Sequence, residues 1–340
     1  MSIVRRLRQR AGAIVHDWPR FEATIRGLGP YRRLPSPWVA MRNRNERITL
    51  DGRGARCEWI YGSDLHVANV YPSLGARLMK RAFRDWPVDL RDAPSSVEAP
   101  RVSFVIGHRG LTRLPHLLLT LRSIAGQRDV PVECIVVEQS ASPEIESALP
   151  PWVRYVHTPV EPDYDYNRSW TLNEGARAAR GEVLILHDND MICPASYAAE
   201  AAARAAEGWM FQQLKRFIFY LDERRTADVF AGGGLRTDVP ATVVQNVHGG
   251  SIAATRDAFF AIGGFDESFV GWGGEDNEFW DRADTTGRAY HFGYLPFVHL
   301  WHLPQKGKLA GSDAPAVRRW TEVKDIPVHE RIRRLLERTH

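Results

Sequence analysis

Residues 182–190 read EVLILHDND, an apolar run that ends in two aspartates separated by one residue. A short apolar run bounded by polar residues is typical of a buried β-strand. Asp188 and Asp190 would then lie at the carboxyl end of this strand, where open parallel sheets bind their ligands. Carboxylate oxygens suit hard divalent cations, but Asp and Asn also favour ordinary surface turns. The triplet alone therefore leaves a metal site and a plain turn both open.

The segments before this strand alternate between apolar runs and helical patterns. Expected strands cover residues 102–107, 132–138 and 153–158, and expected helices cover residues 114–126 and 166–181. Strands and helices that alternate at this spacing predict an α/β fold with a mostly parallel central sheet flanked by helices. Arg109 and Glu138 stand at the ends of the first two strands and would share one edge of the sheet with the aspartates.

A second stretch, FVGWGGEDNEFWDR at residues 269–282, places two glycines, a tryptophan and several acids together. Glycines allow positive φ or a close approach of the backbone to a ligand. Glu275 and Asp276 stand where a helix would begin, and the helix dipole favours acids in a first turn. The dipole does not account for Trp272 and the glycines. An aromatic ring beside carboxylates is the usual composition of a sugar site, because the ring covers the apolar face of the sugar.

Two histidines, His299 and His302, follow the apolar segment YLPFV. A histidine pair beside aromatic residues is more often a packing feature than a metal site, so the pair is informative only in combination. The next segment, LPQKGKLAGSDAPA, has the composition of a mobile loop. We expect this loop to place Lys306 or Lys308 beside a bound ligand.

The composition narrows the class of protein. The net charge of +4 comes from scattered arginines without an aromatic-basic ladder, so we expect no nucleic-acid partner. Three widely spaced cysteines fit a reducing cytoplasm and argue against a disulfide framework or a cysteine-bound zinc. No apolar run reaches the roughly 18 residues that a membrane span needs. These features predict a cytoplasmic protein.

The first part of the chain differs from the rest in its amino-acid composition and pattern. It carries several Pro and Gly breaks and one strand candidate at residues 57–62, and DAPSSVEAP at residues 92–100 reads as a linker. We therefore expect an accessory region at residues 1–98, a catalytic domain at residues 99–308 and a helical, basic tail at residues 309–340.

Residues 1–20 show an amphipathic helical pattern. Four arginines lie mostly off its apolar stripe. The helix either docks on its own domain or lies on an anionic bilayer, which would place the protein peripherally at the inner face of the membrane. The stripe consists of Ile3, Val4, Leu7, Ala11, Ile14, Val15 and Trp18.

Several motifs, in order, resemble those of the metal-dependent GT-A glycosyltransferases, and in particular the β-1,4-galactosyltransferases. GHRGLTRLPHL is similar to the family's nucleotide loop, YNRSWTLNEG to its FNRxxxLNxG helix, and HDND to its Asp-x-Asp. HGGSIAATRDAFFAIGGFDESFVGWGGEDNEFWDR resembles the FGGVSA and WGWGGEDDD region over its whole length. The resemblance covers roughly residues 102–308 and implies a GT-A fold.

The resemblance also implies an inverting transfer of galactose or N-acetylgalactosamine from a UDP-sugar to a glycan or glycolipid acceptor. Asp276 would be the general base, and Mn²⁺, or Mg²⁺ in its place, would neutralise the leaving group. The implied metal ligands are Asp190 with a histidine, either His302 or His299. The implied nucleotide contacts are Arg109, Glu138, Tyr166, Arg168, Asp188 and Lys306. The implied sugar contacts are Glu275, Trp272, Gly273, Gly274, Gly250 and Val247.

Two departures from the family pattern bear on specificity. Asn277 replaces the family's third consecutive acid, which concerns the acceptor. Val247 stands where galactosyltransferases carry a bulky tyrosine, so both UDP-Gal and UDP-GalNAc remain candidate donors. Two alternatives stay open: a degenerate scaffold that only binds carbohydrate, and a retaining UDP-GalNAc transferase, whose relatives have Glu-Asn after the double glycine.

Overall fold

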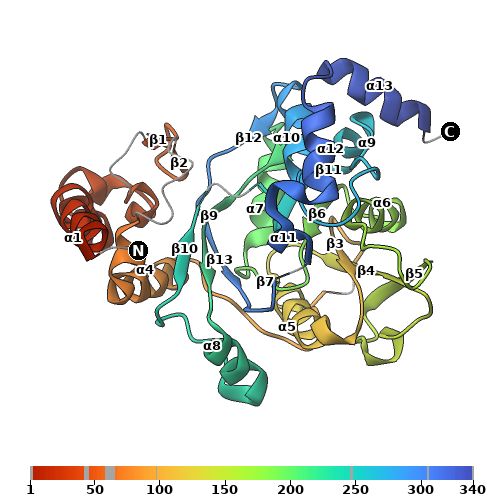
Figure 1. The fold of residues 1–340 in the computed structure, drawn as a ribbon. Coiled ribbons are helices and arrows are strands. Elements are labelled where there is room, and N and C mark those ends of the chain that lie inside the picture. The colour runs from red at the N-terminus through yellow and green to blue at the C-terminus, as the bar shows by residue number, and fades with distance from the viewer. Residues whose placement is uncertain are drawn as a thin grey trace.

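The computed structural model describes residues 3–41, 46–57, 66–96, 98–245, 248–304 and 306–338. Its described strands form a large central sheet, a smaller sheet beside it, and a two-stranded sheet in the N-terminal region (Figure 1). The strands are β1 (Glu46–Ile48), β2 (Ala55–Cys57), β3 (Val102–His108), β4 (Val132–Ser140), β5 (Val153–Pro159), β6 (Val183–His187), β7 (Met191–Ile192), β8 (Phe211–Gln212), β9 (Lys215–Tyr220), β10 (Thr242–Val244), β11 (Ser251–Thr255), β12 (Ala289–Tyr290) and β13 (Leu295–His299).

The central sheet has the strand order β12-β8-β11-β6-β3-β4-β5. Strands β6, β3, β4 and β5 are parallel, whereas β11 runs antiparallel to both β6 and β8. The expected strands coincide with β3, β4, β5 and β6 because buried parallel strands consist of nearly unbroken apolar runs. The predicted α/β class with a mostly parallel central sheet is confirmed.

Helices cover both faces of this sheet. Alternate residues of β3 point into different cores: Phe104 lies in one cluster with Leu121 of α5, and Val105 lies in a second with Leu172 of α6. The helices are α1 (Ile3–Gly12), α2 (Trp18–Arg26), α3 (Val67–Val70), α4 (Pro72–Asp85), α5 (Leu114–Ala125), α6 (Arg168–Ala178), α7 (Tyr197–Ala206), α8 (Glu223–Asp228), α9 (Arg256–Ala261), α10 (Glu275–Asp284), α11 (Lys306–Ala310), α12 (Pro315–Val323) and α13 (Val328–Arg338).

The smaller sheet, β10-β9-β13-β7, links the N-terminal region to the rest of the molecule. Phe217 and Phe219 of β9 pack against Trp38 and Phe83, with ring centroids 6.0 and 5.8 Å apart. The described part of residues 1–98 therefore shares a hydrophobic core with the later sheet. Its division from residues 99–308 as a separate unit remains an expectation.

The N-terminal region is mainly helical. Of the strand expected at residues 57–62, only Cys57 is described, at the end of β2, and the others lie outside the described residues. A π-helical turn, η1 (Ala13–Asp17), joins α1 to α2. Within the described ranges, no helix is both long and apolar enough to cross a bilayer.

The C-terminal part corrects the expected loop and shows a buried acid. The segment predicted to be a loop after His302 contains α11 and a 3₁₀ turn, η7 (Gly311–Asp313), before the expected helical tail. Glu278 of α10, which reads as an ordinary surface acid, is 1% exposed. It lies 2.6 Å from Arg282 and 3.2 Å from Arg331 of α13. The sequence could not indicate this burial because Arg331 is distant along the chain.

Candidate functional site

Two groups of side chains meet where β6, β13, α6 and α10 come together. The first, called here the carboxylate cluster, consists of Asp188, Glu275 and Asp276 around Arg168. The second, called the metal-ligand cluster, consists of Asp190, His299 and His302, whose ligand atoms all lie within 4.8 Å of one another. The turn after β6 contributes one aspartate to each cluster.

Arg168 holds the carboxylate cluster from the first turn of α6, which Asn167 caps through its side chain. Its Nε donates to Asp188 Oδ1 at 2.8 Å and its Nη1 to Asp276 Oδ1 at 3.0 Å. Glu275 Oε1 lies 3.8 Å from the same Nη1. One guanidinium therefore fixes acids that are far apart along the chain.

Three acids around one cation cannot all be neutralised, and the pKa values reflect this. Burial, with Asp276 close by, raises the pKa of Glu275 to about 7. Burial also raises the pKa of Asp188 to about 6, although Arg168 opposes the shift. The pKa of Arg168 rises well above its usual value because the acids outweigh its burial. Glu275 and Asp188 therefore both have pKa values raised toward neutral pH.

Two glycines before β11 shape the space around Asp276. A β-carbon on Gly249 would lie 2.1 Å from Asp276 Oδ2, so a side chain here would displace the carboxylate or the loop. Gly250 has φ of 85° and accepts a hydrogen bond from the Asp188 backbone N–H at 2.8 Å. These glycines bring the backbone close to both carboxylates and leave Asp276 Oδ2 room.

The metal-ligand cluster brings both candidate histidines to Asp190. His302 Nε2 lies 3.2 Å from Asp190 Oδ2, and His299 Nε2 lies 3.6 Å from Asp190 Oδ1. The His299 ring stacks on Tyr220 of β9 at 4.2 Å, which fixes its plane. The sequence left open which of the two histidines would bind a metal with Asp190. Both face this carboxylate, so both could serve as ligands.

The electrostatics of this cluster fit a cation. Burial would raise the pKa of Asp190, but His299, His302 and Arg113 outweigh it and hold the pKa well below its usual range. Burial lowers the pKa of His299, so the ring tends to be neutral, as a metal ligand must be. Among the residues that the structure describes, Asp190 Oδ1 and His299 Nδ1 are buried and have no hydrogen-bond partner. A carboxylate oxygen left unpaired beside two imidazoles suits a divalent metal ion.

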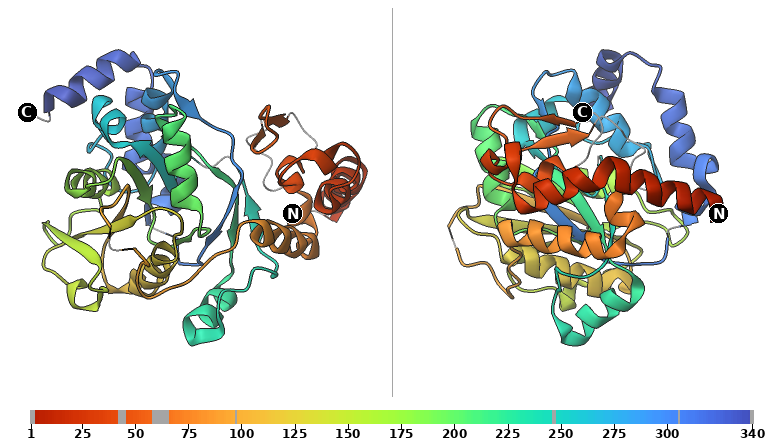
Figure 2. Two further views of the ribbon diagram at one scale, coloured as in Figure 1. Left: turned by 180° about the vertical axis from the view of Figure 1, so that it is seen from behind. Right: turned by 90° about the vertical axis from the view of Figure 1, so that its left-hand side faces the viewer.

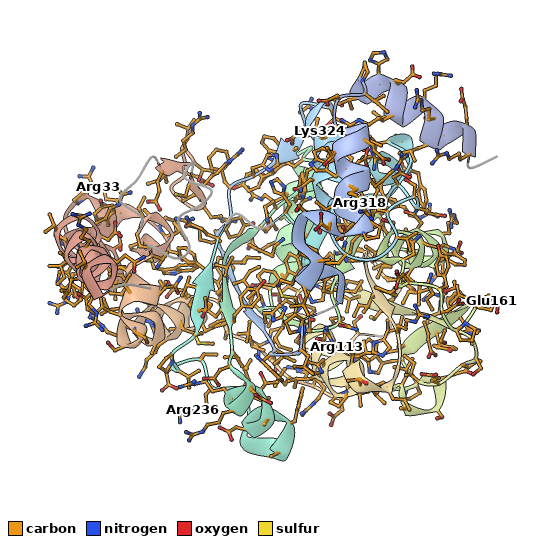
Figure 3. All side chains as sticks on the ribbon, viewed as in Figure 1. Arg33, Arg113, Glu161, Arg236, Arg318 and Lys324 are labelled. Carbon is orange, nitrogen blue, oxygen red and sulfur yellow. The ribbon has the colours of Figure 1, made fainter. Side chains whose placement is uncertain are left out.

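Arg113, at the turn before α5, belongs to this cluster although the sequence analysis did not select it. Its Nη1 lies 2.7 Å from Asp190 Oδ2 and its Nη2 lies 2.9 Å from His302 Nδ1. Figure 3 shows Arg113 beside α5. It occurs within the GHRGLTRLPHL motif, which resembles a nucleotide loop. No spacing rule could show that this arginine reaches a histidine far along the chain.

Lys215 was also missed. It is buried in β9, where its Nζ donates to the backbone carbonyl of Ser251. Burial lowers the pKa of Lys215 to about 7, while Asp276 and Asp188 oppose the shift. The sequence did carry a signal, since a lysine within the apolar strand KRFIFY needs a buried partner.

The proposed nucleotide contacts lie at the edge where β3 and β4 end. Arg109 donates to the carbonyl of Tyr164. The Tyr166 hydroxyl lies 3.2 Å from Thr171 Oγ1, and burial raises its pKa to about 12. Glu138 is fully buried and accepts bonds from backbone N–H groups of the next loop and from a tyrosine hydroxyl. Any nucleotide contact by Glu138 would have to share oxygens that already hold this loop.

Trp272 stands half-exposed before α10, with Lys308 Nζ 5.9 Å from the centre of its ring. Gly273 and Gly274 have φ of 105° and 91°, which favours glycine at both positions. Their α-carbons also face α12: a β-carbon on Gly274 would lie 2.8 Å from Trp320 Cβ. The double glycine thus lets α12 pack closely. The contact of Gly273 and Gly274 with a sugar remains an expectation from the sequence.

Two proposed site residues have no described side chain. Val247 lies outside the described residues. Lys306 begins α11, but only its backbone is described. The side chain of Asn277 is described, and its Oδ1 accepts a hydrogen bond from His248 Nδ1 at 2.9 Å.

Parts of the chain are similar to known proteins. Residues 241–292 match the model of a family described as the N-terminal domain of galactosyltransferase. A Caenorhabditis elegans protein described as probable N-acetylgalactosaminyltransferase 9 is 41% identical over 59 residues, which are 17% of this chain. The chain's match spans 10% of that relative's length. The predicted resemblance to galactosyl- and N-acetylgalactosaminyltransferases is confirmed by these matches.

Two solved structures show low similarity to this chain. GalNAc-T7 with UDP, GalNAc and Mn²⁺ is 14% identical, with a TM-score of 0.49 over 68% of this chain and 48% of that one. The mannosyltransferase PcManGT from Pyrobaculum calidifontis, in complex with GDP-Man and Mn²⁺, is 19% identical, with a TM-score of 0.44 over 78% of this chain and 75% of that one.

Proposed function

We propose that this protein is an inverting, metal-dependent GT-A glycosyltransferase that moves galactose or N-acetylgalactosamine from a UDP-sugar to a glycan or glycolipid acceptor. The observation that carries the proposal is Arg168, which joins Asp188 to Asp276 across the site. Asp276 and the two glycines before β11 lie within the segment that matches the galactosyltransferase family. The adjoining metal-ligand cluster supports a reaction with a diphosphate leaving group.

The metal-ligand cluster fits the cofactor that this function implies. Asp190, His299 and His302 would hold Mn²⁺, or Mg²⁺ in its place. Asp190 Oδ1 accepts no hydrogen bond within the described structure, so it is the atom that most needs such a partner. When bound, the ion would supply positive charge that stabilises the departing diphosphate. Arg109, Tyr166, Arg168, Asp188 and Lys306 are the proposed contacts to the nucleotide-sugar.

Asp276 is the proposed general base. Arg168 holds its Oδ1, which leaves Oδ2 over Gly249 to accept a proton. In the proposed step the acceptor hydroxyl gives its proton to Asp276, and its oxygen forms a bond to the anomeric carbon. The bond from that carbon to the diphosphate oxygen breaks with its electron pair. Attack from the face opposite the leaving group inverts the anomeric carbon.

Glu275 and Trp272 are the proposed donor and acceptor sugar contacts. Glu275 has a pKa near 7 and lies beside Asp276, so it can accept or donate a hydrogen bond to a sugar hydroxyl close to neutral pH. The half-exposed Trp272 ring offers an apolar face for a sugar ring. Gly250, Gly273, Gly274 and Val247 are proposed to line the same space.

The direct test is hydrolysis of UDP-Gal and UDP-GalNAc with Mn²⁺, comparing the wild type with Asp276→Asn. We expect the variant to lose turnover while its UDP affinity, measured by calorimetry, stays close to that of the wild type. Proton NMR of the first sugar anomer released distinguishes inversion from retention. Retained configuration would favour the retaining UDP-GalNAc transferase. Sugar binding without turnover on any donor would favour the carbohydrate-binding scaffold, and failure to bind UDP with Mn²⁺ would overturn the proposal.

A further inference from the structure

The helical segment α1–η1–α2 exposes its apolar side. Along it, Val4 is 61%, Leu7 59%, Ile14 51%, Val15 68% and Trp18 37% exposed. These residues, called here the N-terminal stripe, recur at the spacing of one helix face. In the right-hand view of Figure 2, this segment (red) runs across the face of the molecule that is turned toward the viewer. A helix that served only to cover its own core would turn this stripe inward.

A different face of the segment attaches it to the body. Ala13 and Phe21 are buried there, 4% and 0% exposed. Arg20 Nε donates to the carbonyl of Ala40 at 2.7 Å, and Arg77 of α4 pairs with Glu22 at 2.5 Å. The attachment therefore does not use the N-terminal stripe, whose side chains are left facing outward in the described chain.

Positive charge surrounds the N-terminal stripe. Arg8 and Arg10 are exposed on α1, and the Arg26 side chain at the end of α2 is 64% exposed. Arg26 shares Glu22 with Arg77. These described acids do not offset Arg8 and Arg10 from the surface, because Glu22 is already paired and Asp17 is 3% exposed. An apolar stripe with a partly exposed tryptophan and flanking arginines matches the composition of helices that lie in a membrane interface.

We propose that the N-terminal stripe docks this protein on the surface of an anionic lipid bilayer, with α1–η1–α2 lying in the interface. The apolar side chains would enter the boundary between headgroups and acyl chains, and the arginines would face lipid phosphates. A second copy is a poorer partner, because a two-fold pairing through the stripe would bring the same arginines of both copies together. This docking does not depend on the proposed transferase reaction, and its test uses no donor or acceptor.

The test is sedimentation of the full chain with vesicles that contain phosphatidylglycerol, compared with vesicles of phosphatidylcholine alone. We expect binding to the anionic vesicles that weakens with added salt, because the arginine contribution is screened. The double variant Leu7→Asp and Val15→Asp should lower the partition coefficient by about tenfold or more, since it puts two carboxylates among the inserting side chains. Both positions are exposed, so the changes spare the core.

A matched control makes the same kind of change away from the stripe. Met210 is 39% exposed at the start of β8, and Met210→Asp should bind anionic vesicles like the wild type. The three native cysteines are buried, so a Leu7→Cys variant can carry an environment-sensitive label that reports insertion by a blue shift. Absence of binding to anionic vesicles, or equal binding by the double variant, would overturn the proposal. If the wild type binds no lipid but self-associates, and the double variant loses that self-association, the proposal is also overturned. The N-terminal stripe would then be a contact between two copies of this chain.

Discussion

The guanidinium of Arg113 lies 2.7 Å from the Asp190 carboxylate, and its other nitrogen lies 2.9 Å from His302 Nδ1. A permanent cation thus occupies the side of Asp190 that faces His302. The other carboxylate oxygen, Oδ1, lies 3.6 Å from His299 Nε2 and accepts no hydrogen bond from the described part of the chain. Arg113 therefore neutralises the carboxylate partly and competes with any second cation for it.

Arg113→Gln should tighten the binding of Mn²⁺. Removing a positive charge next to Asp190 removes repulsion of the ion, and a gain of about threefold to tenfold in affinity is expected for partly solvated charges at this separation. Electron paramagnetic resonance of free Mn²⁺ measures this without a sugar donor. Arg122→Gln, on the exposed side of α5 and paired with Asp92, is the control and should change nothing. Weaker binding in Arg113→Gln would mean that the arginine chiefly positions Asp190.

Gly249→Ala tests the space around Asp276. The new methyl group would lie 2.1 Å from Asp276 Oδ2, so the carboxylate must move or the loop must shift. We expect kcat to fall by about 100-fold, a loss typical of a misplaced catalytic group, while the affinity for UDP changes little. Steady-state kinetics and calorimetry measure the two effects. Gly12→Ala is the control, because a β-carbon there meets nothing within 4 Å. Unchanged kcat in Gly249→Ala would contradict a role for Asp276 Oδ2.

These residues show which parts of the molecule the sequence can predict. The strands were predictable because β3, β4 and β6 are buried on both faces and read as continuous apolar runs. Asp188, Asp190 and Asp276 were predictable as candidates because each follows a local signal, a strand end or a pair of glycines. Their meeting around Arg168 depends on how β6, α6 and α10 pack, and no local pattern carries that information.

Arg113 and Glu278 were not predictable for the same reason. Each makes its decisive contact with a residue distant in sequence, His302 for the first and Arg331 for the second. Glu278 also follows two acids of the proposed site in a helix, a context in which an acid normally faces solvent. Lys215 differs from these two residues. A lysine in an apolar strand is recognisable from the sequence, and only the identity of its partner, the Ser251 carbonyl, depends on the fold.

The unusual pKa of Glu275 predicts a pH-dependent stability. Between about 4.5 and 7 the folded protein keeps a proton on this carboxyl that the unfolded chain has lost. The free energy of unfolding should therefore fall as pH rises through this window, under the influence of Asp276, Asp188 and Arg168, which face the group. Glu275→Gln should remove this contribution and be more stable than the wild type above the window by about 1–3 kcal/mol.

Urea unfolding of wild type and Glu275→Gln below, within and above this window measures the difference. The comparison is made between variants because Asp188, with a pKa of about 6, titrates in both. Glu161→Gln, at an exposed position on the outer edge of the molecule near β5 (Figure 3), is the control and should follow the wild type. A stability difference that does not change with pH would show that Glu275 is ionised throughout.

Glu278→Gln tests the buried ion cluster that joins α10 to α13. Glu278, Arg282 and Arg331 are 1%, 0% and 5% exposed, and both arginines contact the one carboxylate. Neutralising that carboxylate leaves two buried guanidinium groups short of negative charge, which should lower the free energy of unfolding by about 3–5 kcal/mol. Urea unfolding measures the loss, and hydrogen exchange should show earlier opening of α13. Asp281→Asn is the matched control, because this acid is 46% exposed and, among the described residues, pairs with Arg331. It should cost under about 1 kcal/mol, and equal losses in the two variants would contradict the buried cluster as the link that holds α13.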